Sequence, residues 1–241
     1  LVMARYNPGA AVGGDPLTAM LESWYIQPRT DQVLFRERLG PDRQKQANVR
    51  IRIDRWPDQH PVSQPLGSMQ GLFMVPSPLE IEPGAEDLAL PPVPLARIQD
   101  DRVWAQSDLS RGQEHKLDPE TAGKPYILAL AAATDQARLI VTGEPHWASD
   151  DIIGLGALGP GSAEMTGAVF PANAELFTNS IYWLAGLEEL IATSARTQDI
   201  RRIGEISPTA YRSLRWGLLT GLPFVVLLVG LVVWVRRREQ R

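Results

Sequence analysis

The last segment of the chain is the feature that most constrains what this sequence can fold into. Residues 216–235 read WGLLTGLPFVVLLVGLVVWV, twenty positions without a charge, and three consecutive arginines follow at 236–238. A helix rises about 1.5 Å per residue, so this segment would span roughly 30 Å, the thickness of the hydrocarbon core of a bilayer. A helix in a soluble core needs a polar face, and this segment has none. The sequence therefore predicts one transmembrane helix, with Trp216 and Trp234 at the two interfaces.

Charge is distributed unevenly along the chain. Residues 1–200 hold 16 Lys and Arg against 26 Asp and Glu, whereas residues 201–241 hold 8 against 2. An acidic body is unsuited to neutralising phosphates, so we do not expect nucleic acid as a partner. Because short Arg-rich segments stay in the cytoplasm, we expect an inner-membrane, single-pass protein with its body on the extracytoplasmic (periplasmic) side and its C-terminus in the cytoplasm. The expected divisions are an α/β domain at 1–195, a basic connector at 196–215, the transmembrane helix at 216–235 and an Arg-rich tail at 236–241.

The ends of the chain and its lack of cysteine add two expectations. Without cysteine, disulfides and cysteine–metal sites are excluded. The chain begins Leu-Val-Met, and its first apolar run ends at Asn7-Pro8-Gly9, which is typical of a strand entered midway. We therefore expect the chain to be the C-terminal portion of a longer protein.

The periodicity of apolar residues predicts a mixed α/β body. Leu17, Leu21 and Trp24 recur at helical spacing and predict a short helix over 16–25, and residues 172–185 predict a longer helix that ends at Gly186. The turn residues Thr134-Asp135-Gln136 predict a hairpin between two strands. Strands are expected at 49–54, 72–75, 79–81, 103–105, 126–132 and 138–142, with a polar stretch through residue 46 and loops at 83–94 and 111–124.

A glycine pattern at 154–159, GLGALG, matches the dinucleotide-binding motif G-x-G-x-x-G but lacks its setting. The motif requires a strand immediately before it and a helix directly after it. Here the preceding strand ends near Thr142, and Pro160 follows where a helix should run, although Glu175 lies at a suitable distance for a ribose contact. We interpret the pattern as a flexible loop and expect no cofactor.

Polar residues gather directly after the strand that ends at Thr142. Ligands bind at the carboxyl ends of strands in open α/β sheets, so this is the candidate ligand or partner loop. A Ser–His–Asp triad is not supported, because no G-x-S-x-G turn carries a serine nucleophile. A metal would find only one histidine with one or two carboxylates. We therefore predict no catalytic or metal residues; a solvated polar loop is the alternative. The candidate residues are Gly143, Glu144, His146, Ser149 and Asp150.

A second candidate surface lies inside the expected transmembrane helix. Gly217 and Gly221 form a G-x-x-x-G pattern that places them with Thr220 on nearly one face. Small residues on one face allow a second helix to approach closely in a membrane. We expect this face to pack on another membrane helix.

The order of short motifs resembles one known family over nearly the whole chain. The pieces are LVMARYNPG, GDPLTAMLESWYI, the turn His60-Pro61-Val62, LFMVPSPLEI, VWAQSDL, ARLIVTGEPHWASDDIIG and NAELFTNSIYWLAGLEELIA, followed by the basic connector and terminal apolar segment. Together they resemble the C-terminal half of the auxiliary subunit of gliding-motility-type ABC transport systems. The chain departs from that pattern after Gly143, where Glu144-Pro145-His146 replaces the usual Asp-Ser-Asp.

This resemblance implies an α/β fold: a Rossmann-like three-layer domain, similar to flavodoxin or glutamine-amidotransferase scaffolds, lacking its N-terminal strands and the nucleophile. It implies a non-enzymatic, membrane-anchored auxiliary subunit without a cofactor, which binds a partner or substrate on the extracytoplasmic side. The implied partners are a polytopic ABC permease, its ATPase and the lipid bilayer. Two alternatives stay open: an accessory single-pass subunit of another large membrane complex, and an enzyme that uses the loop around His146.

Overall fold

The computed structural model describes two units of the chain, Leu1–Asp199 and Ile200–Arg241, which we treat separately. In the first unit the described residues are 1–7, 16–39, 45–107, 109, 115–153 and 170–193. In the second unit they are 213, 215–221, 224, 227, 234, 236 and 238. The glycine pattern at 154–159 lies outside the described residues.

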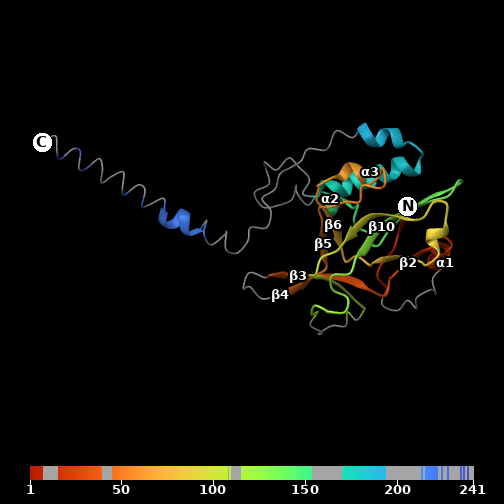
Figure 1. Ribbon diagram of the computed structural model, residues 1–241, viewed down its shortest axis with the longest axis horizontal. Helices are drawn as coiled ribbons and strands as arrows, with labels where there is room; N and C mark the ends of the chain where they lie inside the picture. Colours follow the sequence, from red (N-terminus) through yellow and green to blue (C-terminus); the bar gives the residue numbers. More distant parts are fainter. Residues whose placement is uncertain are drawn as a thin grey trace. The chain divides into compact units, whose positions relative to one another are not determined.

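The described part of the first unit is mostly β-structure (Figure 1). Its strands are β1 (Val2–Met3), β2 (Ile26–Pro28), β3 (Val33–Leu39), β4 (Lys45–Asn48), β5 (Arg50–Ile53), β6 (Gly71–Met74), β7 (Leu79–Ile81), β8 (Val93–Ile98), β9 (Val103–Gln106), β10 (Tyr126–Ala133) and β11 (Arg138–Thr142). Its helices are α1 (Pro16–Glu22), α2 (Asp150–Ile153) and α3 (Pro171–Leu184), with 3-10 turns η1 (Gln64–Leu66), η2 (Ala85–Asp87) and η4 (Glu188–Thr193).

The largest sheet has the strand order β1-β11-β10-β7-β2, and β8 also pairs with β10. The long strand β10 is at the centre of this sheet. Strand β8 pairs with one edge of β10, and β11 and β7 pair with successive parts of its other edge. All these pairings are antiparallel except that of β1 with β11. Two smaller antiparallel sheets, β4-β3-β9 and β5-β6, complete the described unit.

The predicted Rossmann-like three-layer α/β fold is therefore wrong. A Rossmann-like sheet is built from parallel strands, each joined to the next by a crossover helix. In the described part of this unit only one strand pair is parallel, and β10 runs directly into β11 through a tight turn. Helices are few, and strands predominate over them.

Several local predictions are confirmed. Helices α1 and α3, the strands β5–β7 and β9–β11, and the hairpin of β10 with β11 all occur within a few residues of their expected positions. The strands β3 and β4 were missed, because charged residues interrupt their apolar pattern. Strand β8 was also missed, because Pro94 lies within it. Proline is tolerated there since β8 pairs, among the described strands, with β10 alone.

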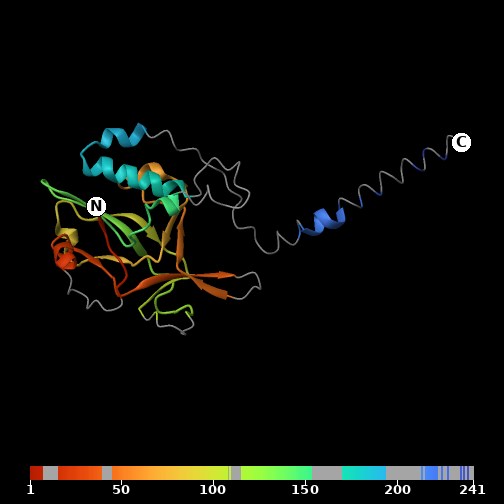
Figure 2. The ribbon, with the colours of Figure 1, turned by 180° about the vertical axis from the view of Figure 1, so that it is seen from behind.

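Helices α3 and α1 cover opposite faces of the large sheet. Successive side chains of a strand point to opposite faces. Ala131 and Ile140 belong to the same buried cluster as Leu176 of α3. Their sequence neighbours, such as Leu130, belong to a second cluster that contains Leu21 of α1. Figure 2 shows α3 running along the sheet on the side away from α1.

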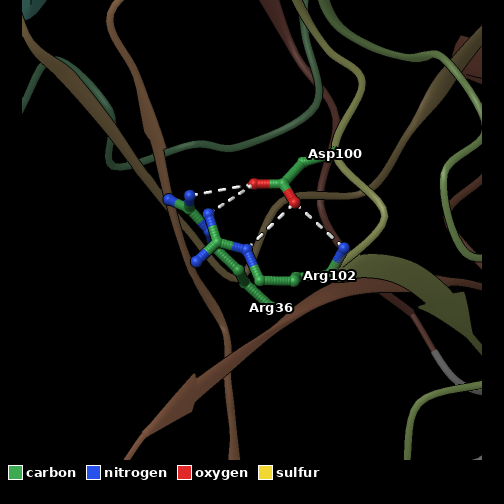
Figure 3. A network of polar contacts seen from close by, with 3 residues as sticks. All are labelled: Arg36, Asp100 and Arg102. Carbon is green, nitrogen blue, oxygen red and sulfur yellow. Dashed lines mark hydrogen bonds and ion pairs between the residues drawn. The ribbon is translucent and has the colours of Figure 1, made fainter. Parts of the chain in front are cut away.

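An ion-pair network ties β3 to the turn between β8 and β9 (Figure 3). The carboxylate of Asp100 accepts hydrogen bonds from Nη2 of Arg36 (2.9 Å) and from Nε and Nη2 of Arg102 (3.1 Å each). Burial by itself would raise the pKa of Asp100, but the hydrogen bonds from Arg102 and the charge of Arg36 outweigh it and hold this pKa below its usual value. The network is therefore a structural link between elements far apart in the sequence.

In the described residues, no helix combines the length and the apolar character that crossing a bilayer requires. This finding corrects the prediction of a transmembrane helix at 216–235 and the single-pass inner-membrane location based on it. The structure has a five-residue π-helix, Gly217–Gly221, within that segment. Most other residues of 216–235 lie outside the described residues.

Candidate functional site

Gly143, the first residue of the candidate loop, lies between strand β10 and the segment just before β7. Its N–H donates to the carbonyl oxygen of Leu128 (2.9 Å), and its own carbonyl oxygen accepts from the N–H of Ser77 (2.8 Å). A Cβ added to Gly143 would lie 1.9 Å from the carbonyl oxygen of Ser77, which is far inside a van der Waals contact. Gly143 therefore has a structural role, because only glycine fits this close approach of two backbones.

Glu144 points into the core instead of toward solvent. Its side chain is fully buried, and its carboxylate oxygens accept hydrogen bonds from the N–H of His146 (2.6 Å) and the N–H of Met74 (3.4 Å). Burial raises the pKa of Glu144 to about 7, although both hydrogen bonds act in the opposite direction. The carboxyl group thus fastens the candidate loop to β6 and is not presented to a ligand in solution.

The remaining residues of the candidate loop do not converge on a site. The carbonyl oxygen of His146 accepts from the N–H of Ser149 (2.9 Å), and that of Ser149 accepts from the N–H groups of Ile152 and Ile153 in α2 (3.0 Å each). The His146 and Asp150 side chains are exposed, and among the described residues no hydrogen bond joins either of them to Ser149. No group of three His, Cys, Asp or Glu residues in the described part of the chain could hold a metal ion. The loop is therefore the entry to α2.

Asn173, which was not predicted from the sequence, connects three segments near this loop. Its Oδ1 accepts from the N–H of Leu72 (2.8 Å), and its Nδ2 donates to the carbonyl oxygens of Leu72 (2.8 Å) and Trp147 (2.6 Å). The available signal was its position, since Asn173 shares the buried face of the helix with Leu176 and Trp183. A polar residue on an apolar helix face indicates a specific buried partner. Glu175, considered above for a ribose contact, is likewise buried in α3, at 5% exposure.

His60, in the His-Pro-Val turn, packs against the end of α3. Its ring meets that of Trp183 edge-on at 4.8 Å, and its Nδ1 accepts from the N–H of Val62 (3.2 Å). Burial lowers the pKa of His60 to about 4, and the charge of Arg138 adds to this effect. The Arg138 guanidinium lies 5.2 Å from the ring centre of Trp183, donates to its carbonyl oxygen and pairs with Glu188. These contacts attach the end of α3 to β11 and to the His-Pro-Val turn.

The end of α3 exposes a group of apolar side chains. The N–H of Gly186 donates to the carbonyl oxygen of Trp183 (3.1 Å) and the N–H of Leu187 donates to that of Tyr182 (2.8 Å), with φ of +72° at Gly186. This is a Schellman motif, which returns Leu187 to the last turn of the helix, where Ile181 lies. The side chains of Ile181, Leu187 and Leu190 are 44%, 40% and 40% exposed. We call these three residues the α3 patch.

A pocket of about 230 Å³ lies near the opposite face of the large sheet, beside α1. It is lined by residues 23–25 after α1, by residues 88–90 and 92 after η2, and by residues 132–135 at the end of the β10–β11 hairpin. Sites for drug-sized ligands measure roughly 300–1,000 Å³. The pocket is thus of a size for one or two side chains.

Tyr25 at the pocket has an unusual backbone conformation, with φ of +57°. It is fixed there because its N–H donates to the carbonyl oxygen of Glu22 (2.9 Å) and its carbonyl oxygen accepts from the N–H of Glu82 (2.9 Å). A bulky residue in the left-handed region costs about 1–2 kcal/mol. Such strain tends to occur at functional sites, and the pattern of turn residues in the sequence gave no sign of it.

The second candidate surface lies within the C-terminal unit. Gly217, Thr220 and Gly221 all lie in the π-helix, where Oγ1 of Thr220 donates to the carbonyl oxygen of Trp216 (2.6 Å). A Cβ added to either glycine would meet no atom within 4 Å. The described residues therefore place no second helix against this face.

Two comparisons with known proteins were made by sequence. No family model matches this chain, and no curated protein matches its sequence. The resemblance to the auxiliary subunit of ABC transport systems thus depends on the order of its motifs.

Proposed function

We propose that this protein is a non-enzymatic accessory subunit of an ABC-type transport complex, and that it acts by binding another subunit of that complex. The observation that carries the proposal is the α3 patch, Ile181, Leu187 and Leu190. These residues lie within NAELFTNSIYWLAGLEELIA, one of the segments that resembles the auxiliary-subunit family. The segment with the family's pattern thus also carries an exposed apolar surface.

The patch has two properties of a protein-binding surface. Adjacent large apolar side chains lose contact with water when a partner covers them, and such patches often mark interaction sites. The backbone of the patch is also fixed by the Schellman motif, and its neighbours Trp183 and Glu188 are in contact with Arg138. A preorganised surface loses less conformational entropy on binding than a flexible one.

Co-purification tests this proposal. The full chain, carrying an affinity tag, is extracted under mild conditions from cells that naturally make it, and its partners are identified by mass spectrometry. We expect an ABC permease and its ATPase to co-purify. The double substitution Leu187→Ser and Leu190→Ser should reduce their recovery at least several-fold.

Met20→Ser is the matched control, because Met20 is 42% exposed on α1 and lies outside the patch. The control should co-purify with the same partners as the unaltered chain. Repeated recovery of the chain alone would contradict the proposal. Recovery with subunits of a different complex would contradict it as well, and would favour an accessory role elsewhere.

A further inference from the structure

We propose that the pocket beside α1 binds a segment of a partner protein in which an arginine or lysine stands next to an apolar side chain. The inference rests on the proposed function only in that the occupant is a protein. The site is separate from the α3 patch, because α1 and α3 cover opposite faces of the large sheet. Three features of the pocket support this occupant: its apolar wall, its acidic surroundings and the position of Tyr25.

The wall of the pocket is apolar and partly open to solvent. Trp24 packs against the buried cluster of α1, and Ala132 at the base of the hairpin is itself part of that cluster. Leu90 on the facing segment is 50% exposed, so its side chain is available to a ligand. An apolar side chain entering the pocket would therefore exchange water for contacts with Trp24 and Leu90.

The surroundings of the pocket are acidic. Asp135 is the charged residue of the lining, and the lining has no lysine or arginine. Glu22 and Asp87 each adjoin a lining segment in the sequence and are exposed. The cation at the start of β11, Arg138, is already paired with Glu188. An occupant with a positive charge would meet uncompensated negative charge, whereas an acidic occupant would be repelled.

Tyr25 places an aromatic ring at the pocket in spite of its strained backbone. Glycine would adopt the same φ without strain, so the turn by itself does not require tyrosine. A cation in the pocket would be attracted by the π-face of an aromatic ring and by the charge of a carboxylate such as that of Asp135. Tyr25 and Asp135 both line the pocket, so together they favour a basic side chain there.

Titration with three blocked peptides tests the inference on the full chain. The probes are Ac-Gly-Leu-Arg-Leu-Gly-amide, the same peptide with glutamate in place of arginine, and the same peptide with serine in place of both leucines. Binding is followed by nuclear magnetic resonance, through the amide signals of Leu90 and Ala133 and the indole signal of Trp24. We expect only the first peptide to shift all three signals in a saturable way, and added salt to weaken its binding.

Two substitutions locate the binding at the pocket. Asp135→Asn removes the exposed charge and should weaken binding roughly threefold, a typical effect of one solvent-exposed charge. Tyr25→Gly keeps the backbone conformation and removes the ring, and it should weaken binding roughly fivefold. Asp58→Asn is the matched control, because Asp58 is exposed and does not line the pocket. The control should leave the affinity unchanged.

The outcomes separate this inference from the proposed function. Equal binding of the arginine and glutamate peptides, or shifts that Asp135→Asn leaves unchanged, would overturn the inference. The inference would also be overturned if no signal shifted in a saturable way at several millimolar peptide. A Kd of about 1 mM corresponds to a binding free energy of only about −4 kcal/mol. Neither result affects co-purification through the α3 patch. Conversely, peptide binding at the pocket without recovery of ABC subunits would retain the site and contradict the proposed function.

Discussion

The side chain of Asn173 pairs with the backbone of Leu72, 101 residues earlier in the chain, as a neighbouring β-strand would. The Leu72 N–H donates to Oδ1 of Asn173, the Leu72 carbonyl oxygen accepts from Nδ2, and both distances are 2.8 Å. The same Nδ2 also donates to the carbonyl oxygen of Trp147. One side chain on α3 thus satisfies backbone groups of β6 and of the loop that follows β11.

Asn173→Ala should lower the free energy of unfolding by about 3 kcal/mol. The substitution leaves buried backbone groups of Leu72 and Trp147 without partners, and each such group costs about 1–3 kcal/mol. Urea denaturation monitored by tryptophan fluorescence measures the change. Asn48→Ala is the control, since Asn48 accepts one hydrogen bond near the surface, from the N–H of Arg50. A loss at Asn173 no larger than that of the control would show that the pairing contributes little.

Gly143→Ala should destabilise the fold by about 3 kcal/mol or more, the upper range for inserting a methyl group into a packed interior. The added Cβ would meet the carbonyl oxygen of Ser77, and neither backbone can move without breaking the hydrogen bond between them. Circular dichroism during urea denaturation gives the midpoint. Gly221→Ala, where a Cβ meets no atom within 4 Å, should leave the midpoint unchanged. Equal midpoints for both variants would contradict the close approach at Gly143.

Glu144 should make the fold less stable as pH rises through the range from about 4.5 to about 7. The unfolded chain releases this proton near pH 4.5, whereas in the folded protein the pKa of Glu144 is about 7. Between these values the folded state binds more protons, so stability falls with rising pH. Glu144→Gln removes the effect. Its stability relative to the unaltered chain should rise by about 3 kcal/mol from pH 4.5 to 7, at 1.36 kcal/mol per pKa unit. A constant difference across this range would disprove the assignment.

His60 should have the opposite effect on the pH dependence of stability, over nearly the same pH range. Its pKa is about 4 in the folded protein and 6.5 in the unfolded chain. The unfolded state therefore binds more protons between these values, and stability falls as pH drops from 6.5 to 4. The two effects nearly cancel in the unaltered chain, so together these groups should make its stability change little between pH 4.5 and 6.5. His60→Gln should leave the Glu144 effect unopposed, giving stability that decreases as pH rises; urea denaturation in a pH series tests the slope.

The hairpin and α3 show how much of the fold was predictable. Turn residues at Thr134-Asp135-Gln136 and the apolar spacing from Leu176 to Trp183 are local signals, and both elements form where they indicate. The strand β8 gave no such signal, because Pro94 is tolerated only through its position at a sheet edge. Strand direction was not predictable either, because pairing joins residues far apart in the chain, as in β2 with β7.

The candidate loop shows the same difference between what could be predicted from the sequence and what depends on the tertiary structure. Its residue types placed a polar loop after β11, and the structure has one there. Whether Glu144 faces solvent or the core depends on the N–H of Met74, a partner 70 residues away. Likewise, the pocket combines three segments that are distant in the sequence. No pattern within any one of them indicated that they would meet.

The sequence by itself indicated α1 and α3 to within a few residues and their apolar faces, but not the short helix α2, because backbone hydrogen bonding in a helix and the choice of turn residues are local. Only the tertiary structure decided how the strands pair, that the large sheet is mainly antiparallel, that Glu144 is buried and that Tyr25 stands at a pocket. The physical reason is that periodicity identifies an apolar face but not the element that covers it. That choice depends on contacts between residues distant along the chain, such as Asn173 and Leu72.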